Sequence, residues 1–174
     1  MQHLAVKIFA QPGAKLDASN AIAMFHRWIQ HRDLPELLID VADYAHLPEG
    51  PGVVLMGHEA AYSLDTSRGR LGLLYSRREP VDLDGPASLR HAYDSALRAA
   101  HRVENEPEFQ GRLRFNPNDF EVIWNDRLLH PNTTESWEKV RPVLDTFLHE
   151  LGRDFRITRH ADPRDRLRIE AVAA

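Results

Sequence analysis

Residues 46–79 form the stretch of the chain that is richest in side chains able to do chemistry. Two apolar runs, 53–56 and 71–75, enclose a group of proton-transferring and ionic side chains. The candidate catalytic residues of this group are His58, Glu59, Tyr62 and Asp65. Imidazole, carboxyl and phenol groups can exchange protons with a substrate, which is the basis of general acid–base catalysis. The candidate binding residues beside them are Arg68 and Arg70, because a guanidinium can hold a carboxylate or phosphate through paired hydrogen bonds.

A metal site and an acid–base group are two alternative readings of this stretch. A helical zinc motif requires a second histidine four residues after His58, where the chain has Tyr62, so we predict no metal. A ligand set built from His58 with His46, Asp40 or Asp65 would depend on the fold alone.

The acid–base reading meets an obstacle in strand geometry. Adjacent residues of a strand point to opposite faces, so His58 and Glu59 share a site only if Gly57 introduces a bulge. The reading that we favour is structural: Glu59 pairs with a nearby arginine, and His58 forms a hydrogen bond with the backbone.

Two further candidate binding residues, Asp40 and Asp43, follow the apolar run 37–41. Ligands of α/β proteins collect at the carboxyl ends of parallel strands, which would bring these carboxylates to the site. The structural alternative, which we favour, is that both carboxylates accept hydrogen bonds within the turn that follows.

Arginines also cluster near the C-terminus, at positions 156, 159, 164, 166 and 168. Spacing of two within a strand places Arg164, Arg166 and Arg168 on one face, where they could bind phosphates or carboxylates. Acidic residues are interspersed among them, so the favoured reading is a solvated sheet face with balanced charge.

Composition and missing motifs exclude several classes of protein. The 174 residues contain no cysteine, which excludes disulfides, thiolate metal sites and cysteine nucleophiles. No P-loop, dinucleotide-binding glycine motif or nucleophile elbow occurs, so no cofactor is predicted. The 22 basic and 26 acidic residues give a net charge of −4, which argues against nucleic acid as a partner. Without a signal peptide or an apolar span, the chain is predicted to be cytoplasmic, with no membrane partner.

Apolar periodicity predicts the elements that must position these residues. Three segments carry apolar residues three and four apart, as helices do: 17–32, 86–104 and 132–151. Pro142 is expected to kink or divide the last helix, and Asn132 with Glu135 resembles a capping box. Strands are expected over 3–10, 37–41, 53–56, 60–64, 70–76, 155–159 and 167–172. A three-stranded meander is expected over 112–115, 120–124 and 127–129.

This order of elements predicts an α+β fold. The expected architecture is three helices packed on a mixed, mostly antiparallel sheet with an N-terminal βαβ unit. We expect one domain over residues 1–174, with 81–85 as the place where a boundary could fall. For function, the first hypothesis is a non-catalytic binding or protein-interaction domain that associates with itself, as a homodimer, through a sheet edge or helix face. The alternative is a small hydrolase-like enzyme that uses region 58–70.

Overall fold

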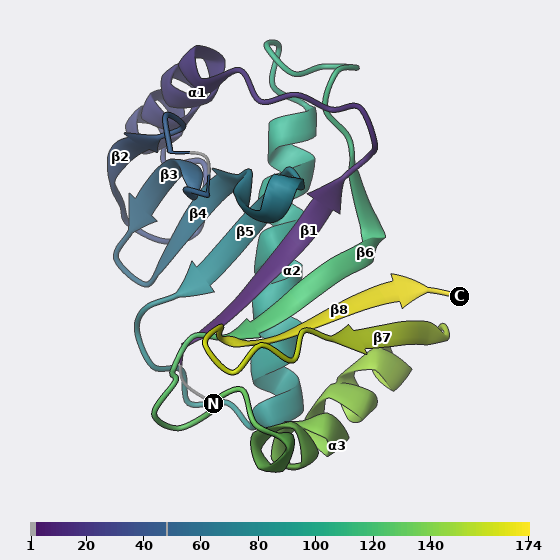
Figure 1. The fold of residues 1–174 in the computed structure, drawn as a ribbon. Coiled ribbons are helices and arrows are strands. Elements are labelled where there is room, and N and C mark those ends of the chain that lie inside the picture. Colours follow the sequence, from purple (N-terminus) through teal and green to yellow (C-terminus); the bar gives the residue numbers. More distant parts are fainter. Residues whose placement is uncertain (1–2, 48) are drawn as a thin grey trace.

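The computed structural model of the protein describes residues 3–47 and 49–174, and its elements follow one another in the order of Figure 1. The described helices are α1 (Ala18–His31), α2 (Gly85–Glu104) and α3 (Thr134–Glu150), with a short 3-10 turn, η1 (Ser67–Gly69). The strands are β1 (Leu4–Ala10), β2 (Leu38–Tyr44), β3 (Gly52–Gly57), β4 (Ala60–Asp65), β5 (Gly72–Arg77), β6 (Phe115–Trp124), β7 (Phe155–Arg159) and β8 (Leu167–Ala173).

The strands form one eight-stranded sheet in the order β2-β3-β4-β5-β1-β6-β8-β7. Every neighbouring pair in this order is antiparallel. The predicted α+β fold, with three helices on a mostly antiparallel sheet, is therefore confirmed. The expected strand–helix–strand order is present as β1, α1 and β2, although β3, β4 and β5 lie between the two strands. The sheet also crosses the candidate boundary at 81–85, because β1 pairs with β6.

The helices begin where polar side chains can satisfy the first free amides of a helix. Asp17, Asp84 and Thr133 cap α1, α2 and α3, and each side chain accepts a hydrogen bond from an amide three residues later. Asn132 is therefore not the cap of α3 that the sequence suggested. Helix α3 also runs unbroken through Pro142, with one helical span from Thr134 to Glu150.

All three helices pack on one face of the sheet, and this packing forms the hydrophobic core. One row of cross-strand neighbours on this face runs through Val53, Leu64, Leu73, Ile8 and Phe120, all of them buried. Helix α2 crosses behind β1, β5 and β6 in Figure 1, and it contacts these three strands most closely. The opposite face, which we call the open face, is covered by none of the three α-helices described above.

The predicted meander over 112–129 is wrong. Residues 115–124 form one strand, β6, and residues 127–129 lie in a turn. The segment 116–119, which has turn chemistry, makes a bulge instead: Ile8 pairs with Phe120, but Ala10 pairs with Phe115. Antiparallel pairing with β1 on both sides of the bulge keeps the strand continuous.

Candidate functional site

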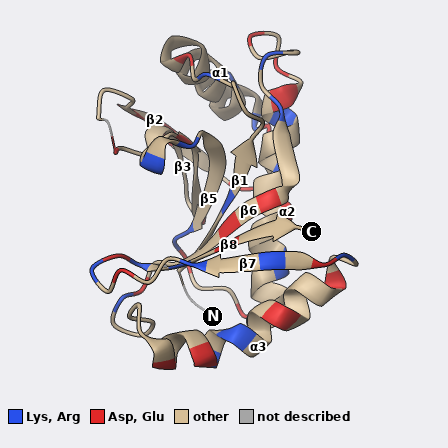
Figure 2. Cartoon of the chain, turned by 45° about the vertical axis from the view of Figure 1, so that its right-hand side comes forward, with Lys and Arg blue, Asp and Glu red and all other residues tan. Residues whose placement is uncertain are grey.

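The open face carries a row of charged residues at its centre. Lys7 on β1 lies opposite Glu121 on β6, and Glu121 lies opposite Glu170 on β8. Figure 2 shows acidic residues within β6 in the middle of the sheet. Like charges directly opposite each other, such as Glu121 and Glu170, destabilise a sheet unless cations compensate them.

Two buried ion pairs lie in this central region. Lys7 Nζ donates to Asp65 Oδ1 at 2.5 Å, and the two side chains are 3% and 5% exposed. Arg168 donates to Glu121 at 2.6 Å, with side chains that are 6% and 3% exposed. Arg168 is therefore buried, and the prediction of a solvated arginine face is wrong at this position. Because desolvating charges commonly costs more than pairing them returns, such pairs contribute little to stability.

A cavity of about 200 Å³ lies over this charged row. We call it the Lys7 pocket, and its lining residues are Lys7, Phe9, Ser67, Arg68, Arg70, Glu121, His160 and Glu170. The floor of the pocket comes from β1, β6 and β8. Its walls come from two loops far apart in the sequence: the β4–β5 loop, which contains η1, and the β7–β8 loop.

Gly72 on β5 makes room for the lysine at the floor. A Cβ atom at this position would lie 2.8 Å from Lys7 Cε and 2.8 Å from the carbonyl oxygen of Ile8. A glycine inside a strand commonly marks such a close approach. Because position 72 has no side chain, the Lys7 side chain can lie close to the backbone of the sheet.

The β4–β5 loop is held by Asp65 and by a strained turn. Asp65 Oδ1 accepts hydrogen bonds from the backbone amide and the hydroxyl of Ser67. Arg68 then adopts a left-handed conformation with φ 59°, which is uncommon for a side chain of this size. Glu49 accepts the amide of Arg68 at 3.0 Å. Strain of this kind concentrates at functional sites, and here it presents the Arg68 side chain at the mouth of the pocket.

Arg70 is fixed by three contacts on the open face. Its guanidinium carbon lies 3.6 Å from the centre of the Phe9 ring. It donates to Glu170 at 2.5 Å and to Asp119 at 2.7 Å. Asp119 reaches this position because it lies in the β6 bulge. Stacking on a ring together with two carboxylate bonds leaves the guanidinium plane little freedom.

The β7–β8 loop is anchored from below by Asn132. Its side-chain amide donates to the carbonyl oxygens of His160 and Asp162 at 2.7 and 2.8 Å. At the top of the loop, Arg68 donates to Asp165 at 2.9 Å and approaches His160 Nδ1 at 3.2 Å. Arg68 thus joins the two loops across the mouth of the Lys7 pocket.

Burial alters the ionisation of the two central groups. It lowers the pKa of Lys7, and the hydrogen bond and charge of Asp65 only partly oppose this shift. It raises the pKa of Glu121, with Arg168 acting in the opposite direction. An amine that loses its proton more easily and a carboxyl that keeps its proton longer, side by side in a cavity, are typical of functional sites.

The structure divides the predicted site residues between the two ends of β4. Asp65, Arg68 and Arg70 meet at or beside the Lys7 pocket. His58 and Glu59 lie in the exposed β3–β4 turn, beyond the other end of the six-residue strand and about 20 Å or more from Asp65 at about 3.4 Å per residue. Glu59 lies 3.4 Å from Arg77, and the backbone amide of His58 donates to Leu37.

Tyr62 belongs to the core face and does not reach the open face. Its hydroxyl donates to Glu36 at 2.7 Å, and burial together with Glu36 raises its pKa. The second oxygen of Glu36 accepts the amides of Glu59 and Ala60, so Glu36 organises the β3–β4 turn.

Asp40 and Asp43 lie exposed on the edge strand β2, and the hydrogen bonds described for their side chains are local. Asp40 accepts from the amide of Val41, and Asp43 accepts from that of Ala45. Over residues 3–47 and 49–174, no group of three or more metal-binding side chains comes together.

The sequence reading missed Lys7, Glu121, His160 and Glu170. Each strand residue of this set is a lone charge between apolar neighbours, as in Val6-Lys7-Ile8. A charge at the centre of an apolar strand is a signal of a buried ionic cluster, because isolated charges are almost never buried. His160 carries no such signal, since it lies in a loop.

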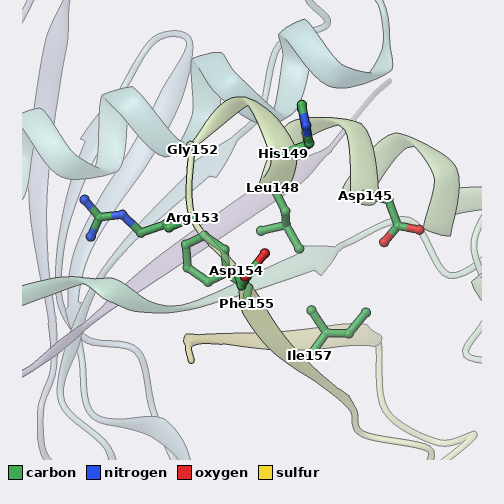
Figure 3. Close-up of a pocket in the computed structure, with 8 residues that line it drawn as sticks. All are labelled: Asp145, Leu148, His149, Gly152, Arg153, Asp154, Phe155 and Ile157. Carbon is green, nitrogen blue, oxygen red and sulfur yellow. The ribbon is translucent and has the colours of Figure 1, made fainter.

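A second, larger cavity of about 580 Å³ lies beside the end of α3. Figure 3 shows its polar side chains, His149, Asp145 and Arg153, pointing in different directions around Leu148 and Phe155. These polar residues are exposed. Without convergent or buried polar groups, this cavity is a weaker candidate than the Lys7 pocket.

Among the residues that the structure describes, no helix has both the length and the apolar character needed to span a membrane. Comparisons with protein-family models, with curated proteins and with solved structures find no match to this chain.

Proposed function

We propose that the protein is a binding domain whose Lys7 pocket holds a small polar ligand. One observation carries the proposal: two nearly inaccessible ion pairs, Lys7–Asp65 and Arg168–Glu121, lie beneath a cavity on the face that does not form the main core.

The fold itself gives no reason for these charges. The helices and the apolar rows of the sheet bury a continuous core on the opposite face. Apolar residues of similar volume in place of a buried ion pair commonly leave stability unchanged or increase it. A ligand supplies the missing reason, because charged groups fixed in a low-dielectric cavity bind polar molecules more strongly than solvated groups do.

The size of the cavity limits the ligand. Pockets for drug-sized molecules usually measure about 300–1,000 Å³. The Lys7 pocket, at about 200 Å³, suits a smaller molecule, such as a metabolite with a short carbon skeleton.

Chemical-shift mapping by NMR tests this proposal. Small polar metabolites would be titrated in groups into the ¹⁵N-labelled protein. We expect a hit to shift the amide signals of Lys7, Ser67, Glu121 and Glu170. Shifts confined to α1, α2 and α3, or no hit from a broad metabolite set, would contradict a ligand site on the open face.

A second candidate function is catalysis by a small hydrolase-like enzyme. The observation in its favour is that burial shifts the pKa values of Lys7 and Glu121 in opposite directions within one cavity. Of the predicted region 58–70, only its end from Asp65 to Arg70 would take part. Turnover of nitrophenyl esters or phosphates by the parent, abolished in Glu121→Gln, would favour catalysis over binding alone.

The remaining parts of the proposal concern location and self-association. The absence of cysteine fits a reducing compartment, and we place the protein in the cytoplasm. Self-association would use the outer edge of β2, where Leu37 and Ile39 are 65% and 54% exposed.

A further inference from the structure

The carboxylates around the Lys7 pocket already accept charge-assisted hydrogen bonds from cations of the same chain. Glu121 accepts from Arg168, and Glu170 accepts from Arg70. Beside the pocket, Asp165 accepts from Arg68. Because these carboxylates are compensated, an incoming cation would have to compete with an arginine for each of them.

Donors, in contrast, remain available at the pocket. Lys7 Nζ carries three N–H groups, and its partners are Asp65 Oδ1 and Ser67 O, so one N–H is left. Arg70 uses its two terminal nitrogens for carboxylates, and its Nε–H has no bond to any described residue.

Unused acceptor oxygens near the pocket do not change this balance. Asp119 Oδ1 is buried and has no partner among the described residues, but Asp119 does not line the Lys7 pocket. The second oxygen of Glu121 has no described partner. The other oxygen of the same carboxyl group accepts from Arg168, so the charge of Glu121 is already compensated.

We infer that the Lys7 pocket takes a small anion, a molecule that carries a carboxylate or a phosphate group. This inference rests on the proposed binding function and names the ligand class of the same site. The lining residues agree with it, since Lys7, Arg68 and Arg70 face the two carboxylates Glu121 and Glu170, and His160 adds a further nitrogen.

Arg68 is the residue that would meet the anion first. Its side chain is 44% exposed at the mouth, whereas that of Lys7 is 3% exposed at the floor. The ligand oxygen would take the place of the Asp165 carboxylate on the Arg68 guanidinium. This exchange keeps the number of charge-assisted bonds constant while the ligand gains the free N–H of Lys7.

Titrations at low salt, followed by NMR, test the ligand class. The probes are succinate for carboxylates, inorganic phosphate for phosphates, glycerol as a neutral molecule and putrescine as a cation. We expect succinate or phosphate to shift the amide signals of Lys7 and Glu121 saturably. The arm that saturates identifies the source of the anionic group, and added sodium chloride should weaken the binding.

Two substitutions link the binding to the pocket. Arg68→Gln should weaken anion binding at least about ten-fold, as expected for loss of a charge-assisted bond. Arg164→Gln is the matched control, because Arg164 lies in the β7–β8 loop but is 91% exposed, and its one partner among the described residues is Asp162. Lys7→Met should abolish binding. If Lys7→Met unfolds the protein, the comparison of Arg68→Gln with Arg164→Gln alone tests whether the anion binds at the pocket.

The other outcomes distinguish the binding function of the pocket from the anionic class of its ligand. Saturable shifts at the pocket with glycerol or putrescine, and none with either anion, would overturn the anion class and leave the binding function standing. Equal weakening by Arg68→Gln and Arg164→Gln would also overturn it. No shift at the pocket with any of the four probes would count against the anion, and the broader metabolite titrations would then decide the binding function.

Discussion

At the scale of single residues, the most important contact of the candidate site is the buried ion pair of Lys7 with Asp65. Both groups are almost inaccessible, and they meet across 58 positions of the sequence. Such a pair contributes little net stability when intact, but removing one partner destabilises the protein because the other charge stays buried without compensation.

Lys7→Met should therefore lower the free energy of unfolding by about 3–5 kcal/mol, because Asp65 stays buried without its cation. The double variant Lys7→Met with Asp65→Leu should regain most of this loss. Urea denaturation of the three proteins measures both effects. A double variant that is no more stable than the single one would show that the charges themselves hold this region together.

The same residues show what sequence reasoning could reach. Asp65, Arg68 and Arg70 were identified because they are neighbours in the chain and share one loop. Lys7, the partner of Asp65, and Glu170, the partner of Arg70, lie on strands β1 and β8, which are 58 and 100 positions away in the sequence. Strand alternation predicts that such residues share a face, but it does not predict which strands will be adjacent.

At the scale of elements, two loops close the Lys7 pocket, and each has its own anchor. Asp65 holds the β4–β5 loop through Ser67. Asn132, directly before the Thr133 cap of α3, holds the β7–β8 loop through two backbone carbonyls. Asn132 is thus a positioning residue, buried to 3% exposure.

Asn132→Ala should lower the free energy of unfolding by about 1–3 kcal/mol, because the part-buried carbonyl groups of His160 and Asp162 lose their donor. It should also speed amide hydrogen exchange in residues 160–166. Asn105→Ala is the control: Asn105 is an exposed asparagine that bonds one carbonyl at the end of α2, and its removal should cost about 0.5 kcal/mol. Unchanged exchange in 160–166 would mean that the loop does not depend on Asn132.

Most elements could be predicted from local pattern, and the exceptions have physical causes. The three helices have strong apolar stripes and good caps, so their existence was clear. The segment 116–119 has the composition of a hairpin turn but forms a bulge, because pairing with β1 continues beyond it. Pro142 does not divide α3, whose Val140, Leu144 and Phe147 are buried on both sides of the proline.

At the scale of the whole molecule, the sheet has one face for stability and one for chemistry. The α-helices cover the first face, and aromatic residues of the hydrophobic core such as Trp28, Phe120 and Phe147 are buried there. The second face keeps its charges, and the edge strand β2 keeps exposed apolar residues. We therefore expect effects on the pH dependence of stability and on dimer formation.

Acid should destabilise the protein through His91 and His130. Burial lowers the pKa of both groups below the usual 6.5, so the unfolded state binds more protons as the pH falls below 6.5. The free energy of unfolding should therefore fall from pH 6.5 down to the folded-state pKa values. The double variant His91→Gln with His130→Gln should show a flatter pH dependence in urea denaturation. The raised pKa values of Asp119 and Glu121 act in the opposite direction, but equally in both proteins.

Self-association through β2 predicts a dimer that a charge at its edge disrupts. Light scattering after gel filtration should give twice the chain mass for the parent and the chain mass for Ile39→Lys. Leu128→Lys is the control, because Leu128 is 94% exposed in a turn away from β2. A monomeric parent at high concentration would rule out this mode of assembly.

The central claim is that the buried charges of the open face serve a ligand and not the fold. Its most direct test is the urea denaturation of one variant in which all four charges become apolar: Lys7→Met, Asp65→Leu, Glu121→Leu and Arg168→Met. We predict a free energy of unfolding equal to or above that of the parent, as for other buried ion pairs replaced by apolar groups. A loss of about 4 kcal/mol or more would contradict the claim, because it would show that the fold itself requires these charges.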